Sequence, residues 1–271
     1  MNKKIIYNSS MPRSGSELLQ VIMHQNPKIY GSTTSPVLEY LYVIRNNTQL
    51  PEAKSQDQEL MKKAFLSICK SLPQDYYKEL TDRPIVFDKN RAWSFYYEWI
   101  SQFNNDVKIV CMVRNLNSIV SSMEKIFRKN LDKPIGPINP QNIQNMTLQE
   151  RVGYWLESHP IGISLKEILD LFNRGISEKV LFIKYEDFCE DPQVELKKIY
   201  EYINEEEFEH YFSGIKKEVF ENDEYFGIYG DHKVKPEIQK PNLKEAENIL
   251  GKNICRQIEK DYGWYFNTFN Y

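Results

Sequence analysis

The sequence has no apolar run long enough to span a bilayer, and its first residues, MNKK, lead into a short apolar stretch without the core of a signal peptide. Only four cysteines are present among 271 residues, and no two of them form a CxxC pair. This spacing argues against a zinc site and a disulfide framework, and it predicts buried thiols in a reducing compartment. We therefore expect a cytoplasmic protein that binds no metal and contacts no membrane.

A strong excess of either charge is also missing. The chain carries 35 Lys and Arg against 38 Asp and Glu, for a net charge of −3. Such a balance creates no broad field that would attract nucleic acid or an anionic membrane, so we expect no nucleic-acid partner. Any anion site in this protein must be built from a local cluster of cations.

Short apolar runs alternate with amphipathic or aromatic-rich segments. Hydrophobic residues make up 41% and aromatic residues 13% of the sequence, enough for the core of one domain over residues 1–271. Apolar runs predict four buried strands, at 5–8, 84–88, 108–113 and 179–185. Helical spacing and polar stops predict the main helices, at 17–24, 37–44, 58–72, 93–103, 116–129, 147–170, 193–203 and 243–262, with the one at 147–170 interrupted near 159–162.

This alternation predicts an α/β fold of the P-loop type. Three layers are expected, with a central, mostly parallel sheet between helices on both faces, because each helix returns the chain for a strand of the same direction. Segments rich in proline, glycine or small polar residues predict loops at 31–36, 131–146 and 213–241. The loop at 131–146 is the best candidate for a lid over a ligand.

One stretch, IIYNSSMPRSGSELL at 5–19, has the pattern of a phosphate-binding loop. A strand, a turn of small residues and the start of a helix bring backbone N–H groups and the helix dipole to bear on an anion. Gly15 permits close approach of the backbone, and Arg13 offers a fork of donors. The standard G-x-x-x-x-G-K-[ST] spacing is absent, so an ordinary strand–turn–helix junction explains this stretch equally well.

Polar side chains also follow the other predicted strands. Lys89 comes after the second, Arg114 after the third and Tyr185 after the fourth. Ligands in parallel α/β sheets bind beyond the carboxyl ends of the strands, where these side chains would meet residues 13–16. This convergence favours an anion site over a plain junction.

Three segments resemble the sulfotransferases that use 3′-phosphoadenosine-5′-phosphosulfate (PAPS). MPRSGSELL at 11–19 resembles their 5′-phosphosulfate loop in an arginine form. VRNLNSIVSSMEK at 113–125 resembles their 3′-phosphate site, with Ser122 eight positions after Arg114. KYEDFCEDPQVELKKIYEYI at 184–203 resembles their Tyr-Glu-Asp segment and the helix after it. The tyrosylprotein sulfotransferases look nearest, since they share the PRSG loop, the spacing from Lys89 to Arg114 and a late Lys-Pro.

The resemblance implies a role for each matching residue. The donor-binding set would be Arg13, Ser14, Gly15, Ser16 and Glu17 at the 5′-phosphosulfate, Arg114 and Ser122 at the 3′-phosphate, Tyr185 near the adenine, and Lys233 and Lys235 on the late loop. Arg13 and Lys89 would stabilise the charge that develops as the sulfuryl group leaves. In-line transfer between two oxygens needs positioned cations and no metal. PAPS is thus the expected co-substrate, and adenosine 3′,5′-bisphosphate its product.

The general base is where this sequence departs from the family pattern. The tyrosylprotein branch carries a Glu after the glycine of the loop that follows the first helix, but residues 31–34 read GSTT here. The cytosolic branch carries a His shortly after the second strand, but residues 88–92 read DKNRA. In their place we consider first Glu39, then Glu17, with Asp88 and His159 as weaker candidates.

The resulting hypothesis is a sulfotransferase that moves a sulfuryl group from PAPS to a hydroxyl or amine of a small metabolite, glycan or peptide. Two alternatives stay open. A P-loop kinase of a small molecule uses a similar loop, although its Lys-[ST] pair is missing here. A catalytically silent nucleotide-binding module would explain the missing base. The sequence leaves the acceptor undefined and permits a homodimer.

Overall fold

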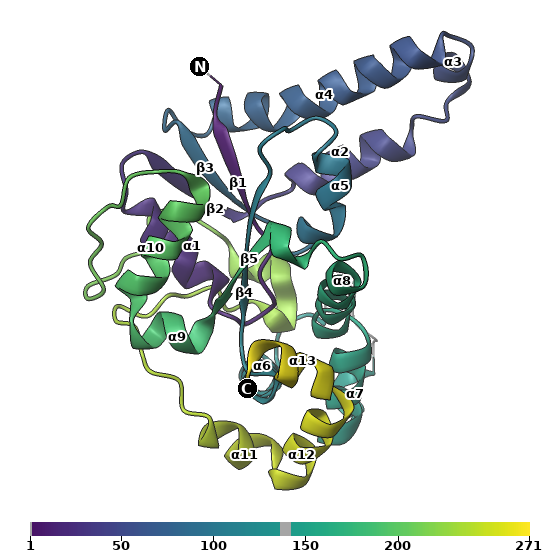
Figure 1. The fold of residues 1–271 in the computed structure, drawn as a ribbon. Helices are drawn as coiled ribbons and strands as arrows, with labels where there is room; N and C mark the ends of the chain where they lie inside the picture. Colours follow the sequence, from purple (N-terminus) through teal and green to yellow (C-terminus); the bar gives the residue numbers. More distant parts are fainter. Residues whose placement is uncertain (1, 136–141) are drawn as a thin grey trace.

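The centre of the fold is a parallel sheet, with helices on both of its faces (Figure 1). The structure, a computed structural model, describes residues 2–135 and 142–271. Within these residues the sheet has five strands in the order β2-β3-β1-β4-β5. Their bounds are β1 Lys4–Asn8, β2 Ile29–Thr34, β3 Ile85–Lys89, β4 Lys108–Val113 and β5 Val180–Lys184. The predicted α/β architecture with a mostly parallel sheet is therefore confirmed.

The helices alternate with the strands along the chain. The first six are α1 Ser16–His24, α2 Val37–Asn46, α3 Pro51–Lys54, α4 Gln58–Lys78, α5 Tyr97–Ile100 and α6 Leu116–Lys129. The others are α7 Leu148–Glu157, α8 Ile161–Asn173, α9 Tyr185–Glu190, α10 Pro192–Ile203, α11 Lys244–Leu250, α12 Lys252–Asp261 and α13 Gly263–Phe269. Short 3₁₀ segments are η1 Ser94–Tyr96, η2 Ile143–Asn145, η3 Ser177–Lys179 and the longer η4 Asp223–Tyr229, which has a kink at Gly227. Across the described ranges, none of these helices is both long and apolar enough to cross a membrane.

Alternate strand residues face two separate cores. Ile6, Phe87 and Met112 pack against the face covered by α1, α9 and α10. Tyr7 and Cys111 point to the opposite face, in the larger cluster that includes residues of α2, α6, α8 and α13. A strand buried on both faces reads as a continuous apolar run, which is why the sequence predicted β4 with its observed bounds.

The predicted loop at 31–36 is wrong, because β2 occupies most of it. Gly31 sits where an added Cβ would come within 2.3 Å of the Gln20 carbonyl oxygen, so the strand needs a residue without a side chain there. The strand is at the edge of the sheet and pairs only with β3. Its polar and glycine residues hide it from a search for apolar runs. The run predicted as the second strand is consequently β3.

Several predicted helices have different bounds. The helix expected at 93–103 is only η1 and α5, and α4 continues through Pro73 to Lys78. Gly251, with φ of 84°, divides the helix expected at 243–262 into α11 and α12, and the aromatic tail forms α13. The proposed lid at 131–146 includes residues 136–141, which lie outside the described residues. The rest of that segment contains η2.

An arm formed by α3 and most of α4 extends away from the sheet (Figure 1). Only Cys69, Pro73 and Tyr77 of α4 are buried, and all three lie in its second half. The far end of the arm is exposed on all sides, with Leu50 and Leu60 about half exposed. The arm therefore contributes little to the central core.

Candidate donor-binding site

The loop between β1 and α1 is shaped to receive an anion. Arg13 and Gly15 both adopt left-handed backbone conformations, with φ of 58° and 91°. The first helical hydrogen bond runs from the Leu19 N–H to the Gly15 carbonyl. The N–H groups of Ser16, Glu17 and Leu18 donate to no described residue, and no side chain caps this end of α1. Free N–H groups at a helix N-terminus are the usual cradle for phosphate or sulfate.

The serines of the loop have different environments. Ser14 is fully buried, and its hydroxyl donates to the Met11 carbonyl at 2.7 Å, which closes the turn. Ser16 is half-buried at the first position of α1. Ser14 thus holds the loop in shape through its side chain, whereas Ser16 lies at the anion-binding end of the helix.

Residues from the ends of β1, β4 and β5 meet at Gly15. A Cβ at this position would lie 2.4 Å from Cδ2 of Tyr185, so the ring packs directly on the glycine. The guanidinium carbon of Arg114 lies 4.5 Å from the centre of the same ring, and Arg114 Nη1 donates to the Arg13 carbonyl at 2.9 Å. Arg114 Nε is buried and has no partner among the described residues. The convergence predicted from the sequence is therefore present.

The side chain of Arg13 connects the loop to two distant segments. Its Nε donates to the Ser122 hydroxyl of α6 at 3.2 Å, and its Nη1 donates to the Asp231 carbonyl at 2.8 Å. Burial lowers the pKa of Arg13, and the nearby charge of Arg114 lowers it further, against the attraction of Asp231. Two guanidinium groups in close proximity repel each other when no anion lies between them. An anion bound by both groups removes this repulsion.

Glu17 lies between two lysines. It pairs with Lys89, from the end of β3, and with Lys217 at 2.5 Å. Lys217 also pairs with the buried Glu221 at 2.8 Å. Burial alone would lower the pKa of Lys217, but the two carboxylates raise it above its ordinary value. Lys217 is thus a cation of the site that the sequence reasoning missed.

In the described parts of the chain, the two lysines predicted for the late loop form no hydrogen bond or ion pair with residues 11–19. Lys233 and Lys235 are both exposed, and Lys235 Nζ donates to Gln239 at 2.6 Å. We call the loop between β1 and α1, with the first turn of α1, the donor loop. The segment that reaches it is instead 217–232, through Lys217 and the Asp231 carbonyl. Nothing local in the sequence distinguishes Lys217 from its neighbour Lys216, because the partner Glu17 belongs to the first helix.

The candidate bases occupy three environments. Asp88 is fully buried and accepts from Tyr77 at 2.7 Å, Ser35 at 3.0 Å and Trp93 at 2.8 Å. Burial raises the pKa of Asp88 to about 6, against those hydrogen bonds. Its oxygens are engaged in the core rather than turned to a substrate.

Glu39 and His159 differ from Asp88 and from each other. Glu39 is exposed, and Asn90 Nδ2 lies 2.9 and 3.0 Å from its two carboxylate oxygens. Burial lowers the pKa of His159 to about 4, as does the charge of Arg91, so this imidazole is neutral at physiological pH.

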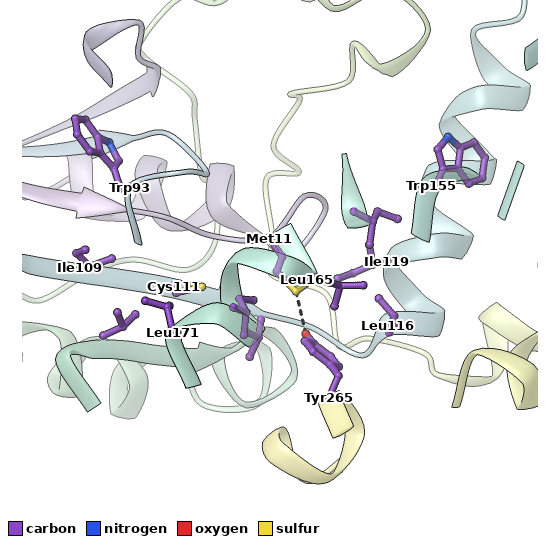
Figure 2. Packing of buried hydrophobic residues seen from close by; sticks show 14 of the residues in the cluster. Met11, Trp93, Ile109, Cys111, Leu116, Ile119, Trp155, Leu165, Leu171 and Tyr265 are labelled. Atoms are coloured by element: carbon purple, nitrogen blue, oxygen red, sulfur yellow. Dashed lines mark hydrogen bonds between the residues drawn. The ribbon is translucent and has the colours of Figure 1, made fainter. Parts of the chain in front are cut away.

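The C-terminal helix α13 packs against residues of the site. The Tyr265 hydroxyl of α13 lies 3.1 Å from the sulfur of Met11, a residue of the loop between β1 and α1 (Figure 2). It also donates to the Arg114 carbonyl at 2.9 Å and lies 3.3 Å from the Arg114 N–H. Glu186 accepts from the Asn115 N–H at 3.0 Å and from the Tyr271 hydroxyl at 2.9 Å. Aromatic residues of the tail therefore contact the Met11 side chain, the Arg114 backbone and the Glu186 side chain.

The sequence pattern of the sulfotransferase family matches residues 6–210, a span that contains the donor loop, Lys89, Arg114, Ser122 and Tyr185. The chain belongs to the sulfotransferase family. The comparison of this sulfotransferase with curated proteins finds no match. Its resemblance to the tyrosylprotein branch stays a prediction. No group of three or more His, Cys, Asp or Glu side chains in residues 2–135 and 142–271 is arranged to hold a metal ion.

One solved structure supports the fold of this sulfotransferase, and others resemble it less. The sulfotransferase domain from the curacin biosynthetic pathway matches it with a TM-score of 0.56 and 17% identity, over 97% of this chain and 98% of that one. The sulfotransferase domain of the Synechococcus PCC 7002 olefin synthase matches with a TM-score of 0.46 and 17% identity, over 76% and 75%. A sulfotransferase from Alicyclobacillus acidocaldarius gives 0.46 and 14%, over 76% and 82%.

Proposed function

We propose that this sulfotransferase uses PAPS as its donor and transfers the sulfuryl group to a hydroxyl or amine acceptor. The observation that carries the proposal is the meeting of Arg13, Arg114 and Ser122 beside the free N–H groups of α1. This arrangement has two cationic forks and a hydroxyl next to a helix N-terminus. It suits a ligand with two separate anionic groups, as PAPS has at its 5′ and 3′ positions.

Each residue has a distinct part in donor binding. The N–H groups of residues 16–18 hold the 5′-phosphosulfate, together with Arg13 and Lys89. Ser122 and the unpartnered Nε of Arg114 hold the 3′-phosphate. When the phosphate binds, it replaces the present contacts of Ser122 and Arg114 with Arg13. The ring of Tyr185 lies beside Arg114 and Gly15 and offers a face for the adenine.

The reaction is an in-line displacement at sulfur. The acceptor oxygen or nitrogen forms a bond to sulfur while the bond from sulfur to the bridging phosphate oxygen breaks. The electron pair of the broken bond stays on the phosphate, which leaves as adenosine 3′,5′-bisphosphate. Arg13 and Lys89 stabilise the negative charge on that leaving oxygen, and the acceptor proton passes to a base.

Calorimetric titration with adenosine 3′,5′-bisphosphate tests donor binding. We expect the wild-type protein to bind this nucleotide, and Arg114→Ala to weaken binding by about 1.5–3 kcal/mol, roughly 10- to 100-fold, because a charge-assisted bidentate contact is lost. Lys62→Ala removes a positive charge from the distant arm and should leave the affinity unchanged. Absence of wild-type binding, together with ATP- and Mg²⁺-dependent turnover, would identify a kinase instead.

The thiols support a proposal on cellular location. Cys69, Cys111, Cys189 and Cys255 are all buried and free. We propose that the protein works in the cytoplasm, where such thiols stay reduced. Fractionation of cells that produce the full-length chain tests this location, which recovery of the protein from an oxidising compartment would contradict.

A further inference from the structure

The segment 217–232, which contacts the donor loop, holds an aspartate and a histidine in direct contact. His232 Nδ1 lies 2.6 Å from Asp223 Oδ1, and the His232 backbone N–H lies 3.1 and 3.2 Å from the two oxygens of the same carboxylate. An ionised carboxylate only accepts hydrogen bonds, so Nδ1 carries the proton of the neutral imidazole. Nε2 is then the basic nitrogen of the ring.

A tight turn fixes the positions of the aspartate and the histidine. Gly230 packs so closely that an added Cβ would lie 2.1 Å from the Asp223 carbonyl oxygen. Asn130, a buried residue at the end of α6, donates from Nδ2 to the Ile228 carbonyl at 3.1 Å and to the Gly230 carbonyl at 3.3 Å. The carboxylate and the imidazole are therefore attached to backbone that is anchored to a helix.

Hydrogen bonds and ion pairs connect His232 to the cations of the donor site. Arg13 Nη1 donates at 2.8 Å to the backbone carbonyl that directly precedes His232. On the other side, Lys217 Nζ donates to the His232 carbonyl at 3.4 Å. Lys217 also pairs with Glu17 at 2.5 Å, and the second oxygen of Glu17 pairs with Lys89. His232 is thus linked on one side to Arg13 and on the other to Lys89, the two cations proposed to stabilise the leaving oxygen.

The two carboxylates that pair with Lys217 are already engaged through both oxygens. Glu17 uses one oxygen for Lys217 and the other for Lys89. Glu221 pairs with Lys217 at 2.8 Å through one oxygen, and the other accepts from a backbone N–H at the end of β2 at 3.3 Å. Nε2 of His232, in contrast, forms no hydrogen bond with any residue in the ranges 2–135 and 142–271. The imidazole is about 20% exposed, so this nitrogen is open to an incoming acceptor.

The surrounding charges keep the imidazole unprotonated at neutral pH. Burial lowers the pKa of His232, and the positive charge of Lys89 lowers it further. Glu221, Asp223 and Glu17 act in the opposite direction, through charge or hydrogen bonding, without reversing the shift. Since an ordinary histidine has a pKa of about 6.5, Nε2 has a free lone pair at pH 7. A neutral imidazole in this position can accept a proton from a substrate.

We propose that His232 is the general base of the transfer reaction and that Asp223 is its positioning residue. This assignment rests on the proposed PAPS-dependent function. As the acceptor oxygen or nitrogen bonds to sulfur, its proton passes to His232 Nε2. The bond from sulfur to the bridging phosphate oxygen breaks, and its electron pair stays on the phosphate. Asp223 holds the Nδ1–H in place and stabilises the imidazolium that forms. The segment 217–232 thus supplies the base that residues 31–34 lack.

Hydrolysis of PAPS tests this role, with water as the acceptor, because water also needs a base when it attacks sulfur. The measurement is the release of labelled sulfate from radiolabelled PAPS. His232→Gln should lower kcat/KM for this release by about 100-fold or more, since a positioned base contributes about 10²–10⁴. Its affinity for adenosine 3′,5′-bisphosphate should stay at the wild-type value. Glu224→Gln, an exposed change in the same segment, should alter neither quantity.

The pH profile of kcat/KM gives a readout that a purely structural role would not change. The wild-type value should rise with pH as the imidazole loses its proton, to a plateau above about 6.5. This acidic limb should disappear in His232→Gln. In Asp223→Asn it should move to lower pH, because a group that raises the pKa of His232 is lost. An acidic limb that is unchanged in His232→Gln would overturn the assignment.

Failure of the base assignment is distinguishable from failure of the proposed donor. Wild-type protein without affinity for adenosine 3′,5′-bisphosphate would overturn the PAPS proposal, and the assignment with it. Wild-type protein that binds this nucleotide but releases no labelled sulfate would overturn the assignment of His232 alone, because a base held at the donor sulfur also activates water. An equal loss of nucleotide affinity and hydrolysis in His232→Gln would place this residue in donor binding instead.

Discussion

Tyr265→Phe removes one oxygen from the place where α13 contacts both Met11 and Arg114. The side chain is fully buried, and its hydroxyl donates to the Arg114 carbonyl at 2.9 Å and accepts from the Arg114 N–H. Burial raises the pKa of Tyr265 well above its ordinary value, so the hydroxyl is protonated at every accessible pH. Phenylalanine keeps the ring in the core and leaves the Arg114 peptide without either partner.

The expected loss of stability is about 1–3 kcal/mol, the cost of leaving buried polar groups unpaired. For a chain of this size that corresponds to a fall in Tm of about 2–4 °C per kcal/mol. Thermal unfolding followed by circular dichroism measures the change. Because Arg114 is displaced with its peptide, affinity for adenosine 3′,5′-bisphosphate should also fall, by about tenfold, or 1.4 kcal/mol.

Tyr225→Phe is the matched control for this substitution. Its side chain is 88% exposed, so the same chemical change should leave Tm and affinity unaltered. The reasoning is refuted if Tyr265→Phe unfolds at the wild-type temperature and binds the nucleotide with wild-type affinity. A lower Tm with full affinity would show that Tyr265 stabilises the core without positioning Arg114.

Three further predictions concern other parts of the molecule. Gly15→Ala should abolish measurable nucleotide binding in calorimetry, because φ of 91° disfavours a side chain and its Cβ would displace Tyr185. Glu124→Gln should lower stability in urea by about 3 kcal/mol, since it leaves Arg151 without its buried carboxylate; an unchanged urea midpoint would contradict this. Burial raises the pKa of Glu167 to about 7, so its ionisation destabilises the fold as pH rises from about 4.5 to 7. Glu167→Gln should therefore raise stability at pH 8 by about 1 kcal/mol relative to wild type and change it little at pH 4; an equal effect at both values would refute the assigned ionisation.

The central strands were predictable because burial on both faces leaves a continuous apolar run. Residues 108–113 show this directly, since the predicted and observed bounds of β4 coincide. The edge strand β2 was not predictable in the same way. Gly31 packs closely against the Gln20 carbonyl, and this contact cannot be predicted from the sequence. Such close backbone approaches depend on the packing of two elements rather than on either element alone.

That the donor loop, Arg114, Ser122 and Tyr185 lie together could be predicted, because each directly follows a strand or matches a family motif. The parts of Lys217 and Tyr265 could not be predicted. Each of them contacts the site only through a partner that lies far away in the sequence. Local sequence patterns thus locate the ends of strands. The side chains that reach those ends from later segments can be identified only when the three-dimensional fold is known.

The contacts of Arg13 have a consequence for how the protein folds. They join residues 109 and 218 positions away in sequence, and Arg114 reaches back across 101 positions to the Arg13 carbonyl. Closing such long loops is entropically costly, so we expect the contacts to form late in folding. A nucleotide bound at this point favours the fully folded state over any partly folded one. Its affinity therefore adds to the cooperative stability of the whole chain, and nucleotide binding reports the completion of folding.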